Sequence, residues 1–82
     1  MKLPVIKHIQ RTASVAEINT TIKVLENISE SSSIKDDERD VIGELISNLC
    51  GAVDVHQLIM DGVPEKDAGN IFMKKVLSSI DQ

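Results

Sequence analysis

Residues 34–63 read IKDDERDVIGELISNLCGAVDVHQLIMDGV, and this stretch decides the fold. Its apolar residues recur at alternating spacings of three and four, which is the period of an α-helix. The main stripe comprises Ile42, Leu45, Leu49, Ala52, Ile59 and Val63, with His56 inside it. A second row comprises Ile46, Cys50, Val53 and Met60. We expect one long helix from Ile34 or Lys35 to Asp61, and two apolar rows require other helices to cover it.

Two helices are expected before this stretch. The first is short, from Leu3 to about Arg11, with Pro4 in its first turn. The second runs from Val15 to about Ser29, because Ser14 and Glu17 have the spacing of a capping box. Residues 18–24 also alternate like a strand. The helical pattern is longer and begins at a cap, so we favour the helix.

A serine-rich loop, residues 29–33, should separate the second helix from the long one, with Ser33 and Asp36 as the next cap pair. Gly62 is placed to end the long helix in a left-handed conformation, and Pro64 to begin a fourth helix. The apolar residues of that fourth helix are Ala68, Ile71, Phe72, Val76, Leu77 and Ile80.

These elements predict a single all-α domain over residues 1–82. It is a four-helix, bundle-like arrangement with a long third helix and a helical hairpin at Gly62, and the first two helices pack against that hairpin. A chain of 82 residues buries only about 60–65% of its unfolded surface. Its one cysteine, Cys50, cannot form an intrachain disulfide. Oligomerisation is the remaining reinforcement, so we expect a homodimer through the long helix.

A flank of small residues marks the predicted interaction surface. Gly43, Ser47 and Gly51 recur every four residues and would let another helix approach closely. That helix could be the second or fourth of the same chain, or it could belong to a second copy, and the sequence leaves both open. We include Val55 in this surface, with His56 as a polar contact beside it.

Chemistry-bearing residues are sparse. No catalytic constellation or phosphate-binding glycine loop is present, and we expect no cofactor, no metal and no enzymatic activity. His56 lacks a carboxylate at its helical neighbours, so we interpret it as a hydrogen-bonded core or interface residue. The acidic cluster at residues 36–40 fits the first turns of a helix, where negative charge is favoured.

Cys50 is expected to be buried and reduced, and no targeting or membrane-spanning segment is evident, which suggests a cytoplasmic protein.

Charge is distributed unevenly along the chain. Residues 1–28 carry +2 and residues 63–82 carry zero, whereas residues 29–62 carry −6, from eight acidic and two basic side chains. The two charged segments could complement each other within one molecule or across a dimer.

The function predicted from these observations is a non-catalytic protein-interaction or assembly module, with an unidentified protein partner possible. One alternative rests on residues 60–65 with Ala68 and Ile71, which resemble the helix-turn-helix of DNA-binding regulators. Nucleic acid is nonetheless an unfavoured partner, because the would-be reading helix opens with Glu65, Lys66 and Asp67. The other alternative is a metal-binding protein whose site, built from Cys50, His56 and acidic residues, is shared between subunits.

Overall fold

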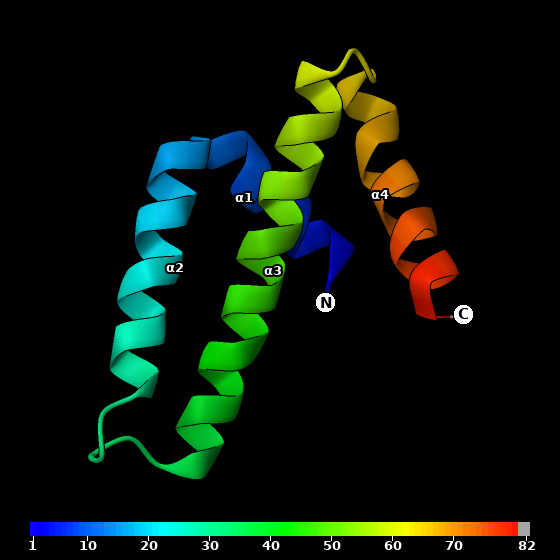
Figure 1. Cartoon of the computed structure of the whole chain (residues 1–82). Coiled ribbons are helices and arrows are strands. Elements are labelled where there is room, and N and C mark those ends of the chain that lie inside the picture. The colour runs from blue at the N-terminus through cyan, green and yellow to red at the C-terminus, as the bar shows by residue number, and fades with distance from the viewer. Residues whose placement is uncertain (81–82) are drawn as a thin grey trace.

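The computed structural model describes the backbone of residues 1–80 and the side chains of residues 1–78. Over this range the elements are α1 (Leu3–Thr12), α2 (Val15–Ser29), α3 (Asp36–Met60) and α4 (Glu65–Ile80) (Figure 1). The prediction of an all-helical chain with four helices is confirmed. No strand occurs in the described part, so the strand-like alternation of residues 18–24 was not decisive.

The long helix α3 lies at the centre of the arrangement. α1, α2 and α4 all pack on it, and α1 also contacts α4, whereas α2 contacts no helix but α3 within the described residues. Figure 1 shows α2 running back along one side of α3, α1 crossing behind its upper half, and α4 returning along the other side. The molecule measures 43 × 30 × 18 Å.

The start of α3 differs from the prediction. The helix begins at Asp36, and the carboxylate of Glu38 accepts a hydrogen bond from the backbone N–H of Lys35 at 3.0 Å. The predicted cap pair of Ser33 and Asp36 is wrong, because the Ser33 N–H donates to Ser31 Oγ at 3.2 Å inside the loop. The acidic residues occupy the first turn as expected, where they oppose the positive end of the helix dipole.

The end of α3 is a Schellman motif, in which a left-handed residue lets backbone N–H groups turn back to the last carbonyls. The N–H of Gly62 donates to Ile59 O at 3.1 Å, and the N–H of Val63 donates to Leu58 O at 3.0 Å. Gly62 has a φ of 104°, the only positive φ among the described residues. Gly62 therefore ends the helix as predicted, and the chain then enters α4 after Pro64.

The predicted cap of α2 is confirmed. Ser14 Oγ accepts from the Glu17 N–H at 3.1 Å, and the Glu17 carboxylate accepts from the Ser14 N–H at 3.0 Å. These bonds to Ser14, the backbone one first, hold the pKa of Glu17 below its ordinary value of 4.5.

The core consists of aliphatic side chains and one aromatic side chain, and all four helices contribute to it. Its buried members are Ile6, Ile18, Ala52, Val55, Ala68 and Phe72. Four predicted core positions are instead exposed: Leu45, Cys50, Met60 and Leu77. Their exposure shows that only the strips of α3 and α4 directly beneath a neighbouring helix are covered. The side chain of Ile80 lies outside the described residues. No helix in the described chain is long and apolar enough to cross a membrane.

Replacing Gly62 with alanine should destabilise the fold by about 1–2 kcal/mol, because an L side chain is strained at positive φ. A Cβ at this position would meet no atom within 4 Å, so the effect isolates the backbone. Gly43→Ala is the matched control: it is also free of contacts but lies inside α3, and it should stabilise by about 0.5–1 kcal/mol. Urea unfolding measures both, and equal effects of the two variants would contradict the strain argument.

The capping box predicts a pH dependence with a defined sign. Because the pKa of Glu17 is depressed in the folded state, its contribution is present above about pH 4.5 and is lost as the pH falls through the folded pKa. The difference in unfolding free energy between the wild type and Glu17→Gln should therefore be constant above pH 5 and should change below it. Chemical denaturation from about pH 3 to pH 7 tests this, and a difference independent of pH would refute it.

Candidate functional site

Gly51, the most central residue of the predicted interaction surface, is already used inside the chain. A Cβ built on it would lie 2.9 Å from Ile6 Cδ1 on α1 and 3.2 Å from Phe72 Cζ on α4. Its missing side chain therefore lets two helices approach α3 at one point. The sequence left open whether this flank packs against a helix of the same chain or against a second copy. At Gly51 the packing is within the chain, and the helices that approach it are α1 and α4, not α2.

Val55 and His56 are also engaged within the chain. Val55 is buried beside Ala52 in the core. His56 is half-buried, and its Nε2 lies 2.9 Å from the carbonyl oxygen of Ala13, at the junction of α1 and α2. Because a carbonyl only accepts, Nε2 must carry the proton that is donated. His56 is thus hydrogen-bonded, as predicted, and it fixes the α1–α2 junction to α3.

The other two predicted surface residues are more accessible. Gly43 is exposed, and a Cβ added to it would meet no atom within 4 Å, while Ser47 is half-buried. The five residues therefore do not share one exposed face, since Gly51 and Val55 are covered by the chain's own helices. Association through Gly43 and Ser47 stays a prediction.

A different apolar surface is open to solvent. It lies on the half of the α2–α3 pair nearest the serine-rich loop, and we call it the open face. Its residues are Val24, Ile28, Val41 and Leu45, which are 40–55% exposed. Within each helix the two members are four residues apart and therefore lie one above the other. Since α2 and α3 run antiparallel, helical geometry places both pairs on the same side, the side on which α1 crosses α3.

The open face exists because α1 is short. Along one stripe of α3, at spacings of four, three, four and three, lie Val41, Leu45, Asn48, Ala52 and Val55. α1 covers the last three, which are all buried, and its first turn stops at Asn48. There the backbone N–H of Lys2 donates to Asn48 Oδ1 at 2.8 Å. The stripe continues apolar for two more turns, and none of the described helices lies above it there.

Charged groups lie at both ends of the open face. Asp37 comes one helical turn before Val41 on the same stripe, at the acidic start of α3. The neighbouring Asp36 is paired with Arg39, whose Nη1 is 3.0 Å from its carboxylate. At the other end, the backbone N–H of Lys2 is bound to Asn48 Oδ1, so the chain's basic residue Lys2 lies at this level of the stripe. The face therefore runs from negative, through apolar, to positive.

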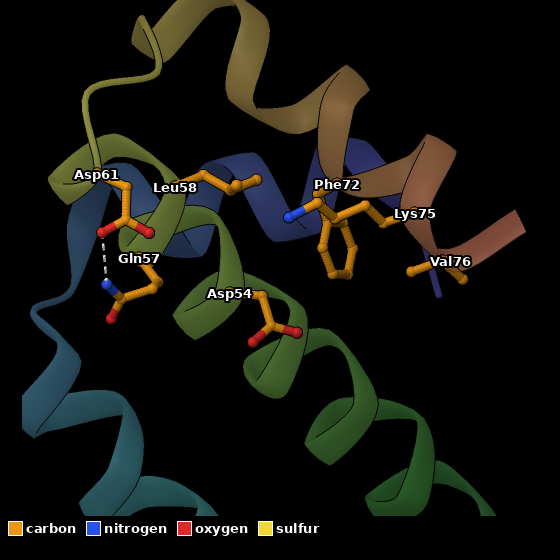
Figure 2. Close-up of a pocket in the computed structure, with 7 residues that line it drawn as sticks. All are labelled: Asp54, Gln57, Leu58, Asp61, Phe72, Lys75 and Val76. Carbon is orange, nitrogen blue, oxygen red and sulfur yellow. Dashed lines mark hydrogen bonds between the residues drawn. The ribbon is translucent and has the colours of Figure 1, made fainter. Parts of the chain in front are cut away.

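A groove of about 300 Å³ lies on another side of α3, against α4. Figure 2 shows the Asp54 carboxylate on one wall and Phe72 and Val76 on the other, with Gln57 donating to Asp61 at 3.0 Å. The remaining lining residues are Leu58 and Lys75. The groove mixes apolar and charged groups, which is typical of a contact surface. Elsewhere in the described residues, no group of three histidine, cysteine or acidic side chains is placed to hold a metal ion.

Comparison with known proteins places the chain in a family. Residues 1–81 match the model of DUF6952, described as a family of unknown function. The chain belongs to this family. Searches of the curated proteins and of the solved structures find no match. The DUF6952 assignment thus gives the chain relatives without giving it an activity, and the function has to be argued from its surface.

Two residues of this DUF6952 chain have structural roles that sequence reasoning missed. Asn48 ties the start of α1 to α3, and a lone asparagine inside an apolar stripe was the available signal. Arg39 donates from Nε to Ser29 O at 2.9 Å and from Nη2 to Ile34 O at 3.2 Å, which closes the loop between α2 and α3. An arginine placed just after a serine-rich loop is a weaker signal, because its partners are backbone carbonyls.

Gly51→Ala should destabilise the chain by about 1 kcal/mol. The new methyl group would overpack the fully buried Ile6, at a cost of about 1–3 kcal/mol, which exceeds the gain of about 1 kcal/mol in helix propensity. Gly43→Ala, in the same helix, is again the control and should stabilise. The urea midpoints of the two variants compare their stabilities directly. A stabilised Gly51→Ala protein would contradict the prediction, because it would show that α1 and α4 can move to accommodate the methyl group without loss of stability.

Proposed function

We propose that this protein is a non-catalytic interaction module that assembles as a homodimer through the open face. The observation that carries the proposal concerns one stripe of α3. α1 covers this stripe from Asn48 to Val55, whereas Val41 and Leu45, earlier on the same stripe, are exposed. Monomeric proteins rarely expose a large contiguous apolar patch, and patches of this kind mark association sites.

The size of the chain supports the same conclusion. Eighty-two residues without a disulfide form a core of few fully buried side chains, so burial of further apolar surface between copies would add stability. The open face is formed by a two-helix layer, and a second such layer would convert it into a four-helix arrangement. The α3–α4 groove would stay accessible in that dimer and is the surface we assign to a further protein partner.

The two alternative functions have less support. In the DNA-binding alternative, the turn after α3 would approach phosphates, yet Asp61, Glu65 and Asp67 surround it. Arg11, a cation near this turn, pairs with Glu65 at 3.4 Å. For a metal site shared between subunits, Cys50 is exposed, whereas the Nε2–H of the half-buried His56 donates to Ala13 O, which leaves Nδ1 as the ring nitrogen that could bind a metal.

Leu45→Glu should weaken the dimer by about a hundredfold, because two half-exposed leucines would be lost from the seam and two charges would be introduced. Leu77→Glu is the matched control: Leu77 is 57% exposed on α4, away from the open face, and its replacement should leave the mass unchanged. Light scattering after size exclusion gives the mass of each. A wild-type chain of 9.0 kDa at high concentration would overturn the homodimer.

A further inference from the structure

We propose that the second copy lies antiparallel on the open face, so that the acidic start of α3 in each copy meets the amino-terminal end of α1 in the other. This inference rests on the proposed homodimer and adds its orientation and the charges that select it. The partner is a second copy of this chain, because the stripe runs from an acidic group through apolar side chains to a basic residue, and this order is complementary to itself when reversed.

The spacing of these groups defines the symmetry. The midpoint of Val41 and Leu45 lies six residues after Asp37, or about 9 Å along the helix, and five residues before Asn48, or about 7.5 Å. A two-fold axis perpendicular to α3 at that midpoint brings Val41 opposite the second copy's Leu45. It also brings Asp37 opposite the level of the second copy's Asn48, to which the backbone of Lys2 is bound. The remaining offset is shorter than a lysine side chain.

Charge disfavours the parallel two-fold arrangement. If the axis ran parallel to α3, Asp37 would face the second copy's Asp37, and the two amino-terminal ends would face each other. Like charges placed opposite each other are unfavourable, and such juxtapositions suppress wrong orientations. Asp37 makes no ion pair within the described residues, since Arg39 is paired with Asp36. One of its carboxylate oxygens accepts the backbone N–H of Glu38 at 3.0 Å, and its negative charge has no cation of this chain beside it in the described part.

The apolar part of the seam fits the same arrangement. Val24 and Ile28 flank the α3 stripe on α2, so an antiparallel second copy would bring eight apolar side chains together between two helix pairs. The interface would have an apolar centre and one charged pair at each end, which is the usual anatomy of a protein interface. A negatively charged membrane surface is a poorer occupant, because it would meet Asp37 and a chain of net charge −4.

Charge reversal tests the orientation separately from the existence of the dimer. Lys2→Glu and Asp37→Lys should each weaken the dimer about tenfold at low salt, because each variant places like charges at both ends of the seam. Equimolar mixing of the two variants should restore affinity to near the wild-type value, since every facing pair is then opposite in sign. The double variant should also recover, and high salt should diminish all of these differences. Sedimentation equilibrium measures the constants, and circular dichroism checks that each variant is folded.

A parallel dimer predicts a different pattern. Lys2→Glu alone would have little effect, and the double variant would not recover, because both copies would still face like charges. A dimeric wild type with this pattern would overturn the orientation and leave the proposed homodimer standing. A monomeric wild type at about 100 μM would overturn both, because association that weak lies outside the range of a stable dimer.

Cysteine crosslinking provides a readout that does not depend on charge. In a Cys50→Ser background, Val41→Cys mixed with Leu45→Cys should form the mixed disulfide under mild oxidation, in preference to either homodisulfide. Preferential Leu45→Cys homodisulfide would refute the antiparallel arrangement. Val41→Cys mixed with Leu77→Cys is the control and should give no mixed product.

Discussion

The continuity of α3 is the constraint on which the other helices depend. α2 has no other neighbour among the described helices, and α1 and α4 converge on Gly51 of this same helix. Each of these helices therefore buries its apolar side chains against α3. A break in α3 would change the positions of the three neighbouring helices relative to one another. The acidic first turn and the Schellman motif fix where this rod begins and ends.

Polar contacts at the helix junctions complement this apolar packing. Asn48 holds the beginning of α1, His56 holds its end through Ala13, and Arg39 holds the loop that follows α2. All three side chains belong to α3 and all three bond to backbone atoms. α3 therefore sets the positions of the connections as well as the packing surface, and its polar residues are placed where a neighbouring helix starts or stops.

The sequence was sufficient for features that depend on neighbouring residues. The period of three and four predicted α3, and the serine–glutamate spacing and Gly62 predicted a cap and a terminator. It was insufficient where coverage depends on distant segments. Leu45 and Ala52 share a stripe and look alike in sequence, yet one is exposed and the other is buried, because α1 is ten residues long and its first turn meets the stripe between them, at Asn48. The small-residue flank left its packing partner open for the same reason, because the spacing of Gly43, Ser47 and Gly51 does not show which helices pack on Gly51.

The anchored amide of Lys2 has a practical consequence. Because that N–H is bound to Asn48 Oδ1, any polypeptide fused ahead of Met1 must leave the molecule one helical turn from Leu45. A purification tag at that end would emerge beside the open face, whereas α4 runs along another side of α3. The choice of fusion site would thus decide which assembly state a purified sample displays.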